Sequence, residues 1–158
     1  MKFEKIGKVQ YLYDNVSDFI FYDKIKLPKR ATQMSAGYDI YSVTDFTLNP
    51  GQSIKLPTGI RVKLDSDKFL AIIPRSGLGF KYRTQLDNTI GIVDADYYNS
   101  SNEGHIWVKI TNDSKKGDVL EIKQGDAICQ GIICQYFLTE DDDVTETRDG
   151  GFGSTDKK

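Results

Sequence analysis

The fold is decided by the stretch Asn88-Thr-Ile-Gly-Ile-Val-Asp94-Ala-Asp96-Tyr-Tyr-Asn-Ser-Ser-Asn-Glu-Gly-His-Ile-Trp107. Its first part is a β-branched and apolar run that leads directly into two carboxylates and two tyrosines. A polar, turn-forming cluster (99–104) follows, and then a second apolar run (106–110). Apolar runs separated by turn residues predict a β-hairpin with a broad loop.

The placement of Asp94 suggests chemistry. An aspartate at the end of an apolar run is expected at the rim of the core, partly dehydrated and fixed in direction. A general base needs such an environment, because its pKa must approach the working pH and its geometry must hold. The alternative is that Asp94 and Asp96 only form a turn at the strand end. The stretch alone favours the turn-forming role, and the choice between the two roles depends on other segments of the chain.

Short strand-like segments separated by turns occupy most of the chain. The apolar run Phe69–Ile73 predicts a strand buried on both faces. Almost no segment has helical periodicity, so we expect an all-β domain of sandwich or jelly-roll type. The other expected strands are one or two within Val9–Lys26, three within Phe46–Leu64, and one each in Val119–Lys123 and Ala127–Leu138.

The segment after Phe69–Ile73, Pro74-Arg-Ser-Gly-Leu-Gly-Phe-Lys-Tyr82, predicts an anion site. Pro74 ends the strand, Ser76 can cap a short helical turn, and Gly77 lets backbone N–H groups face outwards. Free N–H groups beside Arg75 would suit a phosphate. An ordinary strand-to-helix connection with a solvated arginine is about equally compatible with these residues.

Two further polar residues lie in strand-like surroundings. Asp39 follows the small residues Ser35-Ala-Gly37, which permit close backbone approach. It is either a turn or ion-pair aspartate, or the acidic partner of a functional cation. Gln130 lies between Cys129 and Gly131, where it either satisfies the sheet or binds oxygen atoms of a ligand.

Composition limits the classes of function. The length of 158 residues predicts one domain, and the formal charge of −2 gives no global basic field. Stable, sequence-independent binding of nucleic acid is therefore not expected. A phosphate ligand remains compatible, because a few local cations and backbone donors suffice for it.

Cysteine usage and the N-terminal sequence predict a soluble cytoplasmic protein. Cys129 and Cys134 are five residues apart, which places them on opposite faces of a strand and prevents a bridge. Free thiols suit a reducing compartment. His105 is the one histidine, so a Cys/His zinc site is excluded. The N-terminus is charged, and no apolar run approaches the ~20 residues that a membrane span needs.

The C-terminal segment, residues 148–158, contains Arg148-Asp-Gly-Gly-Phe-Gly-Ser-Thr. Its glycines leave it without a fixed conformation of its own. We expect a lid that closes over a flat, phosphorylated ligand, with Phe152 stacking and Arg148, Gly153 and Ser154 near phosphate. A disordered tail is the alternative, and it is common at C-termini.

Five stretches taken together resemble the trimeric dUTPase family, in its order and along nearly the whole chain. They are Ala36-Gly-Tyr-Asp-Ile, Pro74-Arg-Ser-Gly-Leu, Gly91-Ile-Val-Asp-Ala-Asp-Tyr, Gly125-Asp-Ala-Ile-Cys-Gln and Gly150-Gly-Phe-Gly-Ser-Thr. Residues 1–25 fall outside the resemblance. It implies a distorted jelly roll (β-clip type) over residues 1–147, followed by the lid.

The resemblance also implies an activity. It is the hydrolysis of dUTP to dUMP and pyrophosphate with Mg²⁺, in a homotrimer whose sites are shared between subunits. This reaction keeps uracil out of DNA and supplies dUMP for thymidylate synthesis. Mg²⁺ would be held by the substrate triphosphate and waters, with no direct protein ligand, which fits a sequence without a cluster of ligands.

The family roles then fall on matching residues. Asp94 would activate the water that attacks the α-phosphorus, and Tyr97 would pack beneath the deoxyribose and exclude a 2′-hydroxyl. Phe152 would stack on the base, while Asp39 and Asp96 would act from an outer shell. The remaining substrate-binding positions are Arg75, Ser76, Gly77 and Gln130 for phosphates, Asn88, Gly91, Ile106 and Trp107 around the uracil, and Arg148, Gly153 and Ser154 in the lid.

Two departures from the broad family pattern resemble the branch of Gram-positive bacteria and their phages. The hairpin loop, Tyr98 to Gly104, is longer than the usual Tyr-x-Gly. Arg148 is one residue closer to Phe152 than usual, and Asp156 stands where glycine is common. These departures bear on which phosphate Arg148 meets.

Two other functions remain as alternatives. A dCTP deaminase shares the expected fold and the Arg-Ser pair, but it needs a catalytic glutamate and a site for cytosine, and the Asp94 stretch matches the hydrolase pattern. A regulatory module would use nucleotide binding to expose or hide a surface for a protein partner. The acidic run Glu140–Asp143 and the N-terminal segment are where such a partner could dock.

Overall fold

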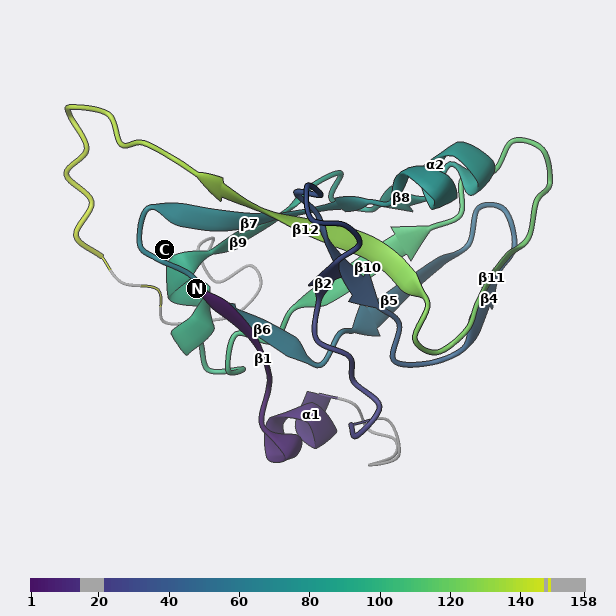
Figure 1. Cartoon of the computed structure of the whole chain (residues 1–158), viewed down its shortest axis with the longest axis horizontal. Coiled ribbons are helices and arrows are strands. Elements are labelled where there is room, and N and C mark those ends of the chain that lie inside the picture. Colours follow the sequence, from purple (N-terminus) through teal and green to yellow (C-terminus); the bar gives the residue numbers. More distant parts are fainter. Residues whose placement is uncertain (15–21, 147, 149–158) are drawn as a thin grey trace.

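The computed structural model describes residues 1–14, 22–146 and 148. Figure 1 shows a mostly β molecule, with α1 at the bottom of the view and α2 at the upper right. The described strands are β1 (Lys2–Lys5), β2 (Lys29–Arg30), β3 (Tyr38–Tyr41), β4 (Phe46–Leu48), β5 (Ser53–Pro57), β6 (Ile60–Lys63), β7 (Lys68–Pro74), β8 (Gln85–Leu86), β9 (Gly91–Asp94), β10 (Trp107–Thr111), β11 (Leu120–Ile122) and β12 (Ala127–Gln135). The helices are α1 (Lys8–Asp14), α2 (Ser76–Tyr82) and the 3₁₀ helix η2 (Ala95–Asn99).

The largest sheet has the strand order β2-β3-β12-β7-β9. Its long strand β12 runs through the middle of the molecule (Figure 1) and pairs antiparallel with β3 on one side and β7 on the other. Gln130 lies opposite Asp39 of β3 and opposite Ile73 of β7. This register brings three distant parts of the sequence to one place on the sheet.

The described residues form three smaller antiparallel sheets as well, in the orders β5-β10-β8, β1-β6 and β11-β4. Alternate residues of their strands point into one apolar core, as the pleat requires. Among the fully buried side chains are Ile40, Ile60, Leu70, Ile106, Ile110 and Ile128. The prediction of an all-β domain is confirmed.

The predicted hairpin in residues 88–107 was wrong, because the two strands of this stretch, β9 and β10, do not pair with each other. β9 pairs with β7, and β10 pairs with β5 and β8, so the two runs belong to different sheets. η2 separates them. The residues that directly follow β9 form η2 instead of a tight turn, so the chain leaves the sheet of β9 before β10 begins.

The strands predicted within Val9–Lys26 were also wrong for the part that the structure describes. Lys8–Asp14 is helical, and Tyr11 is its buried residue. Tyr11 packs edge-on against Tyr22, with ring centroids 5.5 Å apart. The alternation of aromatic and polar residues in Val9–Lys26 predicted strands. A short helix is stabilised mainly by tertiary packing, which here is the packing of Tyr11.

Two local expectations need correction. β7 is not buried on both faces, because only Leu70 and Ile72 are buried in it and its other residues are partly exposed. Ser76 does not cap α2. The N-cap is Arg75, which makes no side-chain capping hydrogen bond, and Ser76 is the first helical residue.

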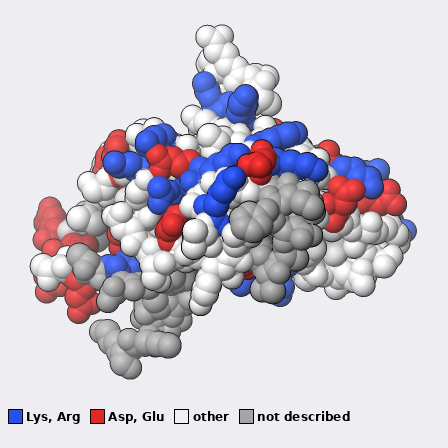
Figure 2. All heavy atoms as spheres, turned by 90° about the horizontal axis from the view of Figure 1, so that it is seen from below, with Lys and Arg blue, Asp and Glu red and all other residues white. Residues whose placement is uncertain are grey.

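Charges of both signs share the surface. Figure 2 shows Lys and Arg side chains gathered along the middle of one face, with Asp and Glu beside and between them. Cys129 and Cys134 are free, as expected, and Cys129 is buried. None of the helices within the described ranges is long and apolar enough to cross a membrane.

Candidate active site

One cluster of predicted site residues forms where β3, β12 and β7 lie side by side. Arg75 Nε lies 3.0 Å from Asp39 Oδ1, and its Nη1 donates to the carbonyl oxygen of Ala127 over 3.3 Å. Gln130 Nε2 donates to the carbonyl oxygen of Pro74 over 3.3 Å. These contacts fix the direction of a cation and of an amide near the end of β7.

The cluster surrounds a hollow of about 250 Å³. Ser76 and Gly77, at the start of α2, are exposed beside it. Nothing lies within 4 Å of where a Cβ on Gly77 would be, so a ligand can approach the backbone there. Gly37 is different, because a Cβ on Gly37 would collide with Gln130 Oε1. The hollow is lined by Ala31, Ser35, Gly37, Asp39, Arg75, Ser76, Gly77, Leu78 and Gln130.

A second, more apolar hollow of about 440 Å³ lies between β7, β8 and β10. Asn88, Gly91 and Trp107 line it, together with Lys55, Ile72, Leu86, Asp87, Val108 and Lys109. The Lys55 ammonium lies 4.8 Å from the centre of the Trp107 ring. The size of this hollow and its apolar walls suit a small aromatic ligand.

Ile106, expected near the base, is placed differently. Its side chain is fully buried. Its carbonyl oxygen accepts from Thr58 Oγ1 over 2.6 Å, and its N–H donates to the carbonyl oxygen of Ile60 over 3.0 Å. The residue therefore supports the wall behind Trp107, and a direct contact with ligand stays a prediction.

The carboxylates Asp94 and Asp96 lie at a third hollow, of about 550 Å³. The Asp94 side chain is 48% exposed, so it is half-buried at the strand end, and its role as a base stays a prediction. Arg148 reaches both: its Nη2 lies 2.5 Å from Asp94 Oδ2 and its Nε lies 3.1 Å from Asp96 Oδ1. Phe152, Gly153 and Ser154 lie outside the described residues.

Tyr97, which follows these carboxylates in η2, is buried. The Arg148 guanidinium lies 5.8 Å from the centre of its ring. Tyr97 Oη donates to the carbonyl oxygen of His105 over 2.9 Å and accepts from Asn102 Nδ2 over 2.8 Å. Burial raises the pKa of Tyr97, so the phenol stays protonated as a donor.

Ten of the predicted site residues thus line three hollows that share no lining residue, whereas Tyr97, Ile106 and Arg148 line none of these three. The sequence reasoning missed the ring of His105, which is fully buried near Tyr97. A single histidine carries no spacing signal, and its partner Asp14 lies 91 positions away. Only the fold shows that they meet.

Comparisons with known proteins identify the family of the chain. The dUTPase family profile matches residues 23–156. A deoxyuridine 5′-triphosphate nucleotidohydrolase of Lactococcus lactis is 35% identical over 134 residues, covering 83% of this chain and 88% of that protein. The corresponding protein of Desulfitobacterium hafniense is 37% identical over 138 residues, covering 82% and 87%.

Solved structures show the same fold. The crystal structure of dUTPase from Streptococcus mutans superposes with a TM-score of 0.69 at 28% identity, covering 89% of this chain and 99% of that one. The dUTPase from phage phi11 of Staphylococcus aureus gives a TM-score of 0.63 at 22% identity, covering 78% and 92%. The jelly-roll prediction and the resemblance to bacterial and phage dUTPases are confirmed, and the chain belongs to the dUTPase family.

Proposed function

We propose that this chain hydrolyses dUTP to dUMP and pyrophosphate. The observation that carries the proposal is the cluster of Arg75, Asp39 and Gln130 around an open helix start, in a chain that belongs to the dUTPase family. The relatives' names support the substrate, since they are deoxyuridine 5′-triphosphate nucleotidohydrolases. The product dUMP would serve thymidylate synthesis, and removal of dUTP would keep uracil out of DNA.

The phosphates would bind at the Arg75 hollow. Arg75 offers a planar guanidinium, which suits phosphate oxygens, and its ion pair with Asp39 holds it in direction. Ser76 and the backbone of Gly77 would add neutral donors, and Gln130 would add an amide. Asp39 would act from behind Arg75 as an outer-shell residue.

The uracil would bind in the apolar hollow near Asn88, Gly91 and Trp107. A backbone N–H there would donate to uracil O4, and a carbonyl would accept from N3–H. Cytosine reverses both groups, which would leave buried polar groups unpaired, and such mismatches give large discrimination. A close-fitting wall would also exclude the 5-methyl group of thymine.

Tyr97 would read the sugar. Two hydrogen bonds at its hydroxyl group hold the ring in place, so the ring cannot easily move away from a bound sugar. A ring fixed beneath a deoxyribose leaves no room for a 2′-hydroxyl. This would separate dUTP from UTP by shape.

Asp94 would act as the general base. The carboxylate would take a proton from water, the water oxygen would form a bond to the α-phosphorus, and the bond to the bridging oxygen would break, releasing pyrophosphate. In the described structure, the Arg148 guanidinium forms ion pairs with the carboxylates of Asp94 and Asp96. When substrate binds, the Arg148 side chain would leave these carboxylates and bind a substrate phosphate. Phe152, Gly153 and Ser154 would complete the lid.

Magnesium would accompany the triphosphate. Within the described ranges, no three His, Cys, Asp or Glu side chains form a metal-binding group. Mg²⁺ keeps most of its waters and binds substrate phosphates with few protein ligands, so the residues present fit an ion carried by substrate. When bound, Mg²⁺ would neutralise charge that develops on the leaving pyrophosphate. A phage phi11 dUTPase structure is described with a structural Mg(II) ion.

A homotrimer would complete the site. The phosphate, uracil and carboxylate residues line three separate hollows of the chain. Neighbouring subunits would bring the hollow of one chain against that of the next, and this would also dehydrate Asp94. The separation of the half-sites supports this assembly.

The test is pyrophosphate release from dUTP, dCTP, dTTP and UTP, each with Mg²⁺ and with excess chelator. Strong metal-dependent turnover of dUTP alone is the expected result. Ammonia release from dCTP would instead support a deaminase. No turnover of any nucleotide, with dUTP still bound, would overturn the proposal in favour of a nucleotide-dependent binding module.

A further inference from the structure

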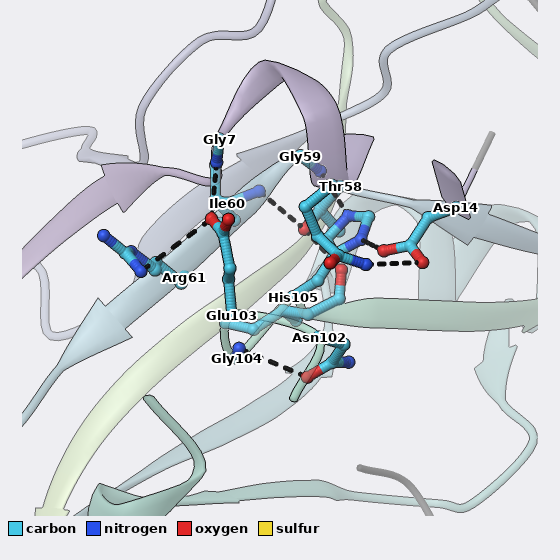
Figure 3. A network of polar contacts seen from close by, with 12 residues as sticks. Gly7, Asp14, Thr58, Gly59, Ile60, Arg61, Asn102, Glu103, Gly104 and His105 are labelled. Atoms are coloured by element: carbon cyan, nitrogen blue, oxygen red, sulfur yellow. Dashed lines mark hydrogen bonds and ion pairs between the residues drawn. The ribbon is translucent and has the colours of Figure 1, made fainter. Parts of the chain in front are cut away.

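The N-terminal segment, residues 1–14, precedes the part of the chain that matches the family profile, which begins at residue 23. It is nevertheless attached to the loop that follows Tyr97. We call this loop, residues 98–105, the sugar loop. Figure 3 shows the two parts joined by a network of polar contacts, with Gly7 and Asp14 on one side and Glu103 and His105 on the other.

The deepest contact joins His105 to Asp14. His105 is fully buried, and its Nδ1 lies 2.6 Å from Asp14 Oδ2. The N–H of Gly59 donates to His105 Nε2 over 3.0 Å. Nε2 must therefore be the unprotonated nitrogen, and Nδ1 carries the hydrogen that Asp14 accepts. Gln10 Nε2 donates to the other carboxylate oxygen of Asp14 over 2.9 Å, which fixes the acceptor.

Two more contacts fasten the loop. The N–H of Gly7, just before α1, donates to Glu103 Oε2 over 2.6 Å. Tyr98 Oη donates to Glu4 Oε2 of β1 over 2.5 Å. Hydrogen bonds from Lys2 and Tyr98 lower the pKa of Glu4 to about 2, so it remains an anion. The sugar loop is thus held at Tyr98, Glu103 and His105 by three points of the N-terminal segment.

The loop in turn holds Tyr97. The carbonyl oxygen of His105 accepts the hydrogen bond of the Tyr97 hydroxyl, and Asn102 donates to the same hydroxyl. Gly104 lies so close to Tyr97 that a Cβ on it would be 2.8 Å from the Tyr97 carbonyl oxygen. Any shift of His105 therefore moves an acceptor of the tyrosine.

We propose that residues 1–14 act as a clamp that positions Tyr97 for discrimination between deoxyribose and ribose. Asp14 and Glu103 are positioning residues in this proposal, because they act through the sugar loop. The inference rests on the proposed function, in which Tyr97 excludes the 2′-hydroxyl. It assigns a function to a segment that precedes the residues matched by the dUTPase family profile.

The physical reason is that exclusion by shape depends on rigidity. A 2′-hydroxyl adds one oxygen atom, and a tyrosine ring free to move by about an ångström would admit it. Displacements of this size cost about 100-fold in rate when they affect reacting groups. Loosening the clamp should therefore raise UTP turnover relative to dUTP turnover.

The experiment measures kcat/KM for dUTP and UTP in Asp14→Ala, Asp14→Asn and Asp23→Ala. Asp14→Ala removes the acceptor of His105, and the ratio of dUTP to UTP should fall by about tenfold or more. Asp14→Asn keeps an oxygen acceptor and should preserve most of the ratio. Asp23 is the matched control, because its side chain is 80% exposed and it pairs with Lys8 of α1 but not with the loop.

A second variant keeps the test decisive if Asp14→Ala does not fold. Glu103→Ala cuts the attachment to Gly7 at a side chain that is 40% exposed, and it should lower the ratio in the same direction. A purely structural clamp would lower the melting temperature and leave the ratio unchanged. A folded Asp14→Ala or Glu103→Ala variant with the wild-type ratio would overturn the inference. Wild-type protein inactive on dUTP would instead overturn the proposed function.

Discussion

Arg148 donates to Asp94: its Nη2 lies 2.5 Å from Asp94 Oδ2, and its Nε bonds to Asp96. The proposed base and a residue of the proposed lid are thus paired within one chain. The guanidinium therefore occupies the side of Asp94 Oδ2 that a water molecule would have to approach. In the proposed mechanism, this pair would have to open before the proposed base meets a water molecule.

Removing the lid should affect catalysis more than folding. A chain that ends at Thr147 loses Arg148 and the glycine-rich segment, and from its composition we expect this segment to contribute little to a core. We expect turnover of dUTP to fall by about 100-fold or more, with a melting temperature close to that of the full chain. Steady-state kinetics and thermal unfolding at equal protein concentration measure the two quantities, and an unchanged turnover number would remove the lid from the mechanism.

Mixed oligomers test where the lid acts. Inactive Asp94→Asn chains and inactive chains that end at Thr147 are refolded together and assayed. Activity should return if the lid of one subunit closes over Asp94 of another, because some sites then receive both intact parts. The contact between Arg148 and Asp94 within one chain is the competing arrangement, and absence of rescue would favour it.

Gly37→Ala tests the phosphate cluster. The added methyl group would collide with Gln130 Oε1 and displace the amide. We expect KM for dUTP to rise by about tenfold, with a smaller change in kcat. Gly79→Ala in α2 is the control, since nothing lies within 4 Å of its added Cβ, and it should leave KM unchanged. Equal kinetics for the two variants would remove Gln130 from the phosphate site.

Stability should depend on pH through His105. Burial lowers its pKa below the ordinary value of 6.5, although Asp14 opposes the shift. The other groups facing the ring are Tyr11, Glu103 and Trp107. Because the unfolded chain binds the proton first, the stabilising contribution of neutral His105 is complete above pH 6.5 and is lost as the pH falls below it. The slope can reach ~1.4 kcal/mol per pH unit.

Urea unfolding from pH 7.5 to pH 5 measures this dependence. The midpoint for the wild-type protein should fall over this range, and the fall should be smaller in His105→Gln, which lacks the titrating ring. Glu4, whose pKa is lowered to about 2 by hydrogen bonds from Lys2 and Tyr98, titrates well below this pH range. It therefore does not contribute to the change in the unfolding midpoint. A midpoint that is constant or rises towards pH 5 would contradict the assignment.

The sequence predicted the strands that carry the site better than the way they pair. Asp39, Arg75 and Gln130 could be named separately, but their meeting depends on the register that sets Gln130 opposite Asp39. Pairing between strands is non-local, so alternation along one strand does not specify its neighbour. For the same reason the apolar runs on either side of η2 predicted a hairpin, while β9 joined β7 instead.

The N-terminal segment was the other part that the sequence did not predict. Lys8–Asp14 has one buried residue, Tyr11, and a helix of seven residues is unstable by itself. Its conformation follows from Gly7, Tyr11 and Asp14 docking on the rest of the domain. Asp14 and His105 carry no motif, and their pairing appears only when the chain is folded.

Asp94→Asn tests the central claim most directly. The amide is nearly the same size as the carboxylate but cannot accept a proton, so pyrophosphate release from dUTP should fall by at least about 1,000-fold. Binding of a non-hydrolysable dUTP analogue, measured by calorimetry, should stay within a few-fold of wild type. Asp23→Asn, at an exposed surface aspartate, is the control and should retain full activity. Substantial turnover by Asp94→Asn would contradict the assignment of Asp94 as the base.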